Sequence, residues 1–408
     1  MKKQHSQKYI IGLIIFFIIA SIISKSILMC RLTVVLIALL CLILSKAERY
    51  TVNPMILFLI TPISLFIYMN LGDVYMVTLT AETWIIAIIN MFAFVIAYKV
   101  TPCYISHCSC ISNTSRNALA KQAILFYLIS LLGYVIPFLQ SILWIFAIPS
   151  IVCALKSKKK AMKAFVVFIF LITAFGMASK SMMLTYCITF IICYEKYYVT
   201  DERKRKWVKW GLGLGVFFMI FAFSFANKDR GNYDADEGVE MYTDRGMKWE
   251  YSASLFMPYM YITNGWTNLQ YVMETQNERT YGLWTLKPLL GYVQLKDHFE
   301  KNYDITTYSS FNTCAYMTYG FKDFGYWGSV IMSLFLGFFV KRVYSRYRMS
   351  RSPYDIASYI LVAQATLELF FSNHFFTQSY PFTIVILMYI VKYFVKNGKY
   401  TIETENKQ

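Results

Sequence analysis

Residues 311–340 read FNTCAYMTYGFKDFGYWGSVIMSLFLGFFV. The first two thirds of this stretch mix polar, aromatic and glycine residues, and the last ten residues are apolar apart from Ser333 and Gly337. A long apolar run is typical of a helix that crosses hydrocarbon, and Tyr and Trp concentrate where such a helix enters the membrane. The stretch therefore predicts a membrane helix over 325–341 whose entry point carries a polar and aromatic cluster.

The whole chain has the composition of a polytopic membrane protein. Of its 408 residues, 57% are hydrophobic and only 15% are charged, and the mean hydropathy is +0.44. A soluble chain of this length needs more charge to cover its surface. The net charge of +17 is a frequent sign of nucleic-acid binding. Here the basic residues lie in short loops between apolar runs, so we expect no nucleic-acid partner.

Apolar runs of helical length predict an all-α protein with about twelve transmembrane helices, since about 20 residues cross the hydrocarbon core. The runs are 9–24, 27–45, 53–70, 84–99, 121–138, 141–156, 162–178, 181–198, 207–226, 325–341, 354–371 and 380–396.

Basic residues between these runs set the expected orientation. With twelve spans, all the basic clusters and both termini fall on one side, which the positive-inside tendency makes cytoplasmic. We therefore expect a multi-pass membrane protein with both termini in the cytoplasm. The clusters lie at 2–3, 46–49, 156–160, 203–209, 341–351 and 392–399.

One long segment separates two groups of helices. The expected organisation is an N-terminal bundle over 1–226, an extracytoplasmic loop over 227–322, and C-terminal helices with a cytoplasmic tail over 323–408. A loop of about 95 residues is too long for a passive connection. It contains Trp249, Trp266 and Trp284, so it is not disordered by composition. Parts of it predict short helices lying in the membrane plane.

Two arginines open this loop. Arg230 and Arg245 each precede a glycine and follow an aspartate. They fit a turn in which Asp pairs with Arg. They also fit a phosphate site, because the planar guanidinium binds phosphate oxygens with two hydrogen bonds.

Lys180 stands at an expected outer turn between two helices. It fits an interfacial lysine whose stem lies along the helix end. It fits equally well a cation that faces a phosphate in a water-filled cleft.

Glu368 and His374 lie close together in ATLELFFSNHFFTQSYPF. Glu368 falls within an expected span, so it should face the bundle interior or a cavity. His374 falls in a short outer loop, where it is either an interfacial histidine or a general base that takes a proton from a sugar hydroxyl.

Asp323 ends the long loop, and we expect it to cap the helix that follows. Nearby, Asn312, Thr313 and Tyr319 supply donors and acceptors suited to sugar hydroxyls. We expect no metal and no cofactor. The cluster Cys103, His107, Cys108 and Cys110 lacks the usual zinc spacing.

Several of these features together resemble one known family. The stretch carries Asn312-Thr313, then Tyr319, then Asp323-Phe324-Gly325 with Gly328, and Ala178-Ser179-Lys180-Ser181 opens a helix. With many helices and one long outer loop, this pattern resembles the Wzy-type oligosaccharide repeat-unit polymerases of O-antigen and capsule synthesis. The family usually has Arg in the position of Lys180. Lysine keeps the positive charge but cannot form the two parallel hydrogen bonds of a guanidinium group.

The resemblance implies a fold and an activity. The fold would be the GT-C-like membrane fold of O-antigen polymerases and ligases. The enzyme would be a metal-independent glycosyltransferase that joins undecaprenyl-pyrophosphate-linked repeat units at the outer face of the membrane. By analogy with the ligases, Arg230 and Arg245 would hold the pyrophosphate and His374 would be the base. Lys180, Asn312, Thr313, Tyr319 and Asp323 would contact substrate. Expected partners are membrane lipid, a chain-length regulator and a flippase.

Two other functions remain open from the sequence. A lipid-linked oligosaccharide flippase of twelve helices should show two related halves and no large outer domain, whereas this chain shows the opposite. A polytopic accessory protein or membrane acyltransferase would fit the pair Asn373-His374.

Overall fold

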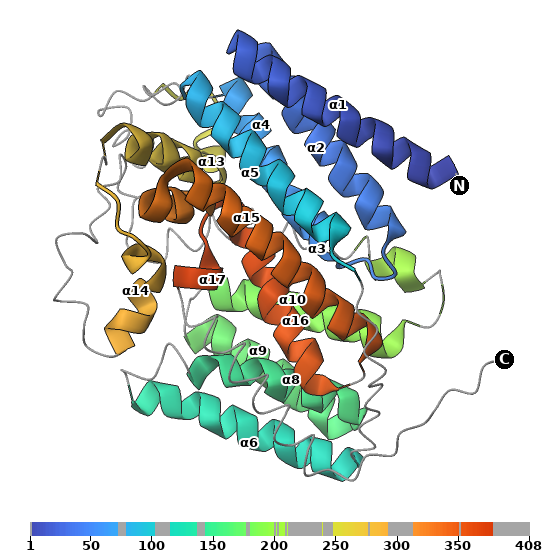
Figure 1. Ribbon diagram of the computed structural model, residues 1–408. Helices are drawn as coiled ribbons and strands as arrows, with labels where there is room; N and C mark the ends of the chain where they lie inside the picture. The colour runs from blue at the N-terminus through green and yellow to red at the C-terminus, as the bar shows by residue number, and fades with distance from the viewer. Residues whose placement is uncertain are drawn as a thin grey trace.

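The computed structural model describes residues 2–71, 79–102, 115–136, 143–176, 180–199, 201, 204–208, 210, 239, 248–275, 278–292, 313–350 and 352–377. Within these ranges every regular element is a helix (Figure 1). The helices are α1 (Lys2–Ser24), α2 (Ile27–Ala47), α3 (Pro54–Phe58), α4 (Ile60–Leu71), α5 (Ala81–Val100), α6 (Arg116–Val135), η3 (Trp144–Phe146), α8 (Ala147–Ser157), α9 (Lys160–Gly176), α10 (Lys180–Tyr198), α13 (Ala253–Thr275), α14 (Leu283–Tyr292), α15 (Met317–Met349), α16 (Pro353–Leu367), η5 (Glu368–Phe370) and α17 (His374–Thr377).

The all-α membrane prediction is confirmed at the level of helices. Among the described residues, five segments are long and apolar enough to cross a membrane, judged by length and composition alone: Gln7–Ser24, Ile27–Ala47, Pro54–Leu71, Ala81–Val100 and Met317–Met349. The apolar helix Trp144–Ser157 is shorter. The expected spans 207–226 and 380–396 lie outside the described residues, apart from the two positions 207–208 and residue 210. Twelve spans and the GT-C-like fold therefore stay predictions.

The helix predicted over 53–70 is broken in the structure. Asn53 caps α3 by accepting hydrogen bonds from the amides of Met55 and Ile56, both at 3.2 Å. The helix stops at Phe58 and restarts as α4 at Ile60. Pro62 explains the break, because it has no N–H to donate to the carbonyl of Phe58 four residues earlier.

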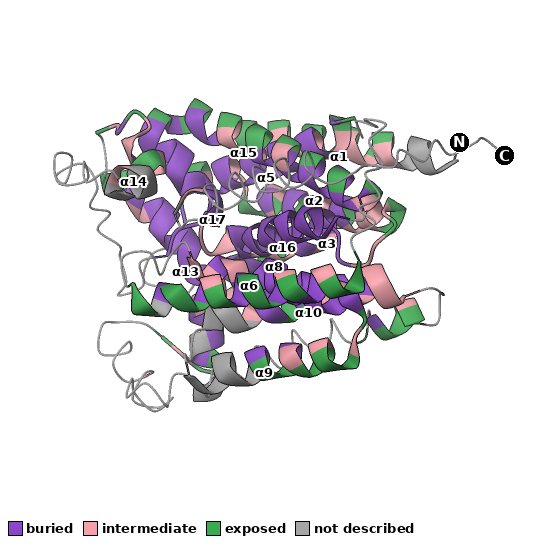
Figure 2. Ribbon diagram, turned by 90° about the horizontal axis from the view of Figure 1, so that it is seen from below, coloured by how far each residue is buried: buried purple, intermediate pink, exposed green. Residues whose placement is uncertain are grey.

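The most central helix is α16, in which every residue from Pro353 to Thr366 is buried (Figure 2). A helix that is buried all round needs apolar or paired side chains on every face. The outer helices α1, α6 and α9 instead present exposed faces in the same view. Exposed apolar side chains such as Ile23, Leu128 and Phe168 on these helices fit contact with lipid rather than water.

Helices α5 and α15 pack side by side and are joined by buried polar groups. The Asn90 amide donates to Ser329 Oγ at 3.0 Å and accepts from Ser333 Oγ at 2.6 Å. All three side chains are fully buried. Paired polar side chains between helices fix their register, since sliding would leave them unsatisfied in an apolar surrounding.

One end of the bundle gathers the basic segments and is here called the basic rim. Glu48, after α2, accepts from Lys341 Nζ at 2.7 Å and from Arg348 at 3.1 Å, both near the end of α15. Tyr98, near the end of α5, donates to the same carboxylate at 2.8 Å. The Lys196 ammonium of α10 donates to the carbonyl of Tyr347 at 2.8 Å. The segments around 46–49 and 341–348 thus meet at one end, as the charge pattern predicts.

The predicted outer loop contains a helix of the bundle core. α13 has 23 residues, far longer than the interfacial helices expected there. Trp266 is fully buried, and its indole N–H donates to Ser64 Oγ of α4 at 3.0 Å. Tyr259 reaches the carbonyl of Leu71 at 2.9 Å. The description of 227–322 as a loop with short interfacial helices is therefore wrong for α13, because its aromatic and small polar residues fill the bundle.

Candidate functional site

The interior of the bundle, at the end of α16 that lies away from the basic rim, holds a buried acid–base pair. His374 Nε2 lies 3.0 Å from Glu368 Oε2, and the side chains are only 8% and 11% exposed. After α16 ends, the amides of Phe371 and Ser372 both donate to the carbonyl of Glu368, at 2.9 and 2.8 Å. This tight turn reverses the chain and brings the imidazole back onto the carboxyl. The expectation that Glu368 faces the interior is confirmed.

The protonation of this pair follows from its burial. Burial lowers the pKa of the His374 imidazole to about 4, because the charged ring would lose its hydration. The ring is therefore neutral at pH 7. Two electronegative atoms at 3.0 Å need a hydrogen between them, so the imidazole and the carboxyl share one hydrogen bond. A neutral imidazole held by a carboxyl has the form of a general base with an orienting group.

The pair continues into a polar network on neighbouring helices. The Gln364 amide of α16 lies 3.5 Å from both oxygens of Glu368. Its oxygen accepts a hydrogen bond from Thr185 of α10. Lys180 is the first residue of α10, five positions before Thr185, or about 7.5 Å along the axis. The structure thus connects the helix that Lys180 opens to the carboxyl beside His374.

Asparagines on α13 and just before α17 hydrogen-bond to Thr313 and Tyr316, the residues that lead into α15. Asn373 donates to the carbonyl of Tyr316 at 3.2 Å. On α13, Asn264 donates to Thr313 Oγ1 at 3.0 Å, and Asn268 donates to the Thr313 carbonyl at 2.5 Å. Thr313 is only 8% exposed, so its hydroxyl is engaged within the protein. Its predicted contact with sugar stays a prediction.

Tyr319 lies against an aromatic partner from the outer segment. Its ring stacks on Trp284 of α14 with centroids 4.3 Å apart and planes 19° apart. Tyr319 is 7% exposed and Trp284 is also 7% exposed. Stacking of this kind contributes about 1 kcal/mol beyond the buried area. The ring therefore holds α14 on α15, and one of its faces is covered.

Asp323 has a role that differs from both predictions made for it. It does not cap the part of α15 that follows the kink, since both of its carboxylate oxygens are bonded to residues 280–285. Its carboxylate instead accepts the backbone amides of Trp284 at 3.0 Å and Thr285 at 2.9 Å, in the first turn of α14. The hydroxyls of Thr280 and Thr285 also donate to it. Asp323 is fully buried, so substrate contact by this side chain is not supported.

The two residues after Asp323 form a kink. Phe324 and Gly325 leave helical geometry, and Gly325 has φ +71° and ψ −154°, a conformation almost restricted to glycine. A Cβ on Gly325 would lie 3.4 Å from the guanidinium of Arg279. The chain then folds back, and Gly320 meets Gly328 so closely that a Cβ on either would touch the other's carbonyl oxygen. Neither Gly320 nor Gly328 can therefore carry a side chain without a shift of the backbone.

Arg279 is a cation beside the kink that was not predicted from the sequence. Its NH1 group donates to the carbonyl of Phe321 at 2.9 Å, and its guanidinium carbon lies 4.7 Å from the Phe321 ring centroid. One hydrogen bond uses one of five guanidinium donors. The sequence NERTYG gives no periodic or motif signal for this position. Only the structure, which places Arg279 beside Gly325, identifies it as a candidate site residue.

The remaining predicted residues divide between described and undescribed parts. Arg230, Arg245 and Asn312 lie outside the described residues, as do the side chain of Lys180 and the cluster 103–110. Within the described ranges there is no group of three or more His, Cys, Asp or Glu side chains that could hold a metal ion.

Comparisons with known proteins give no relative. No protein-family model, no curated protein and no solved structure matches the chain.

Proposed function

We propose that the protein is a glycosyltransferase that polymerises lipid-pyrophosphate-linked oligosaccharide repeat units into O-antigen or capsular polysaccharide. The observation that carries the proposal is the buried Glu368–His374 pair after the end of α16 that lies away from the basic rim. If the basic rim is cytoplasmic, this end of α16 points toward the outer side of a bacterial cytoplasmic membrane, where lipid-linked repeat units are joined.

In the proposed reaction, the hydroxyl oxygen of an incoming repeat unit bonds to the anomeric carbon of the growing glycan. The bond from that carbon to the pyrophosphate oxygen breaks, and the lipid pyrophosphate leaves with the electron pair. The hydroxyl proton passes to the neutral imidazole of His374. Glu368 holds the ring at Nε2 and stabilises it once it is charged, while Gln364 and Thr185 hold the carboxyl.

The leaving group requires cations at the same end. Lys180 opens α10, and the helix connects through Thr185 and Gln364 to the acid–base pair. Arg279, fixed on Phe321 beside the kink of α15, is a further candidate cation. Arg230 and Arg245 are the further candidates that the family resemblance suggests. Guanidinium groups stabilise pyrophosphate through paired charge-assisted hydrogen bonds.

The proposal is tested with full-length protein in liposomes that contain a lipid-pyrophosphate-linked repeat unit. We expect the wild type to form a ladder of longer glycans. The His374→Ala variant should elongate about 10²-fold more slowly or worse, since a general base contributes at least that factor. The Glu368→Gln variant keeps the shape of the side chain but removes the carboxyl group that holds the imidazole, and should also be slow.

Controls separate chemistry from folding. His5→Ala removes a histidine from the N-terminal turn of α1 and should elongate at the wild-type rate. Thermal unfolding in detergent should show that the His374 variant is folded. A folded His374→Ala protein with a normal ladder would refute the assigned base. If the wild type moves the lipid across the bilayer without joining units, the protein is a flippase and the proposal is wrong.

A further inference from the structure

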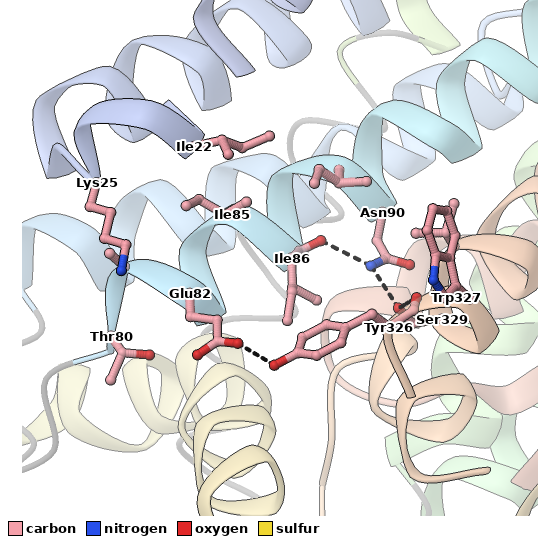
Figure 3. A pocket seen from close by; sticks show the side chains of 13 residues that line it. Ile22, Lys25, Thr80, Glu82, Ile85, Ile86, Asn90, Tyr326, Trp327 and Ser329 are labelled. Carbon is pink, nitrogen blue, oxygen red and sulfur yellow. Dashed lines mark hydrogen bonds between the residues drawn. The ribbon is translucent and has the colours of Figure 1, made fainter. Parts of the chain in front are cut away.

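A groove lies on the lipid-facing side of the bundle, away from the acid–base pair. It has a volume of about 660 Å³ and is lined by the end of α1, the first half of α5 and the part of α15 after the kink (Figure 3). Its apolar walls come from Ile22, Ile85, Ile89, Val330 and the indole of Trp327. The three helices are all candidate membrane spans, so this wall faces hydrocarbon.

One end of the groove is polar. Figure 3 shows Lys25, Thr80 and Glu82 together at this end, with Ile22 and Ile85 farther along. The seven steps along the helix from Glu82 to Ile89 cover about 10 Å. Charged groups at one end and about 10 Å of apolar wall beyond them match an amphipathic molecule whose head lies at the membrane interface.

The two charges at the polar end do not neutralise each other. Lys25 lies in the turn between α1 and α2, with φ +49°, and its ammonium forms no ion pair or hydrogen bond with the described residues. Glu82, in the first turn of α5, accepts a hydrogen bond from the Tyr326 hydroxyl. A cation and a carboxylate thus line the same end of the groove, and no salt bridge joins them. This arrangement suits a ligand that brings both charges.

We infer that this groove is a binding site for one phospholipid with a zwitterionic amine headgroup, of the phosphatidylethanolamine type. Its phosphate would face Lys25, its ammonium would face Glu82, and one acyl chain would lie along Ile85 and Ile89. A purely anionic lipid would meet the Glu82 carboxylate at the same end, so it fits less well. The inference does not rest on the proposed transferase activity.

The geometry also suggests what the lipid does. Helix α1 contributes Ile22 and Lys25 to one side of the groove, and α5 and α15 contribute the other side. Ile23 of α1 is 80% exposed, so α1 lies at the edge of the bundle. A bound chain would fill the space between α1 and the α5–α15 pair and would attach α1 to the core.

The test is native mass spectrometry of the full-length protein released from detergent micelles. The micelles contain equal amounts of phosphatidylethanolamine and phosphatidylglycerol. We expect one retained phosphatidylethanolamine per protein. Lys25→Gln and Glu82→Gln should each lower its occupancy about three- to fivefold, the effect of losing one partly exposed charge contact. Ile85→Trp should lower it further by filling the groove.

Matched controls use the same substitutions elsewhere. Lys46→Gln changes an exposed lysine in the last turn of α2, at the basic rim, and Glu250→Gln changes an exposed glutamate outside the groove. Both should retain the lipid. Equal retention of phosphatidylglycerol with no effect of Glu82→Gln would overturn the zwitterionic headgroup. Retention that is unaffected by Lys25→Gln and by Ile85→Trp, or is lost equally in both controls, would overturn the site itself.

Discussion

Replacing Asp323 tests whether the Asp-Phe-Gly stretch is structural or catalytic. Asp323→Ala removes the cap of α14, which costs about 1 kcal/mol. It also removes two hydrogen bonds from the hydroxyls of Thr280 and Thr285 to a carboxylate, at about 1.5 kcal/mol each. The expected loss in the free energy of unfolding is therefore about 4 kcal/mol.

The measurement is chemical unfolding in detergent micelles, followed by tryptophan fluorescence. The fluorescence of Trp284 should respond to the loss of the Asp323 contacts, because its amide is bonded to Asp323 and its ring stacks on Tyr319. Asp201→Ala is the matched control. Asp201 is half exposed, pairs with Lys204 at 3.4 Å and accepts the Lys204 backbone amide at 2.8 Å, so its loss should cost about 1 kcal/mol, well below the effect at Asp323.

A second variant separates the cap from the charge. Asp323→Asn keeps the shape but presents an amide NH₂ to donors, so it should lose about half as much stability as Asp323→Ala. The reasoning fails if Asp323→Ala unfolds like the wild type but makes no polymer. That result would place Asp323 at the substrate despite its burial.

Three further outcomes are expected. Elongation should persist from pH 7 to about pH 5 and fall toward pH 4. The reason is that burial lowers the pKa of His374, and only the neutral ring takes a proton. A midpoint near 6.5 in the pH–rate profile would contradict this. Gly325→Ala should destabilise the protein by about 1–3 kcal/mol in the same unfolding assay, because φ +71° with ψ −154° strains any residue that has a side chain. Gly12→Ala is the control and should be neutral or stabilising, because a Cβ added at Gly12 would have no atom within 4 Å. Glu48→Ala should cost about 3 kcal/mol or more, since it leaves Lys341 buried without its partner; a wild-type unfolding midpoint would show that the cluster is screened by water.

The charge pattern and the apolar runs predicted much of the fold. Helices along 27–45, 84–99 and 325–341 follow from composition alone, because only a helix satisfies its backbone in hydrocarbon. Basic residues near 46–49 and 341–351 predicted a shared end, and Glu48 joins those two segments directly. The break at Leu59 could also be predicted from the sequence, because Pro62 has no N–H to donate to the carbonyl of Phe58.

The outer segment was predicted less well. α13 resembles a polar interfacial helix in sequence, because it carries Asn264, Thr267 and Asn268. Those side chains are fully buried, and the two asparagines reach Thr313. Hydropathy counts them as solvent-facing, whereas inside a bundle each can be satisfied by a partner that is far away in the chain.

The sequence by itself determined that the chain is helical, that it enters a membrane, and that its basic segments share one end. These properties depend on composition and on contacts within a single helix. Only the tertiary structure decided what Asp323 caps, why Gly325 must be glycine, and that His374 faces Glu368. Asp323 bonds to residues about 40 positions away, and Gly325 is held at φ +71° by the kink between the two parts of α15. The acid–base pair depends on a turn after α16 whose geometry is set by packing rather than by residue type.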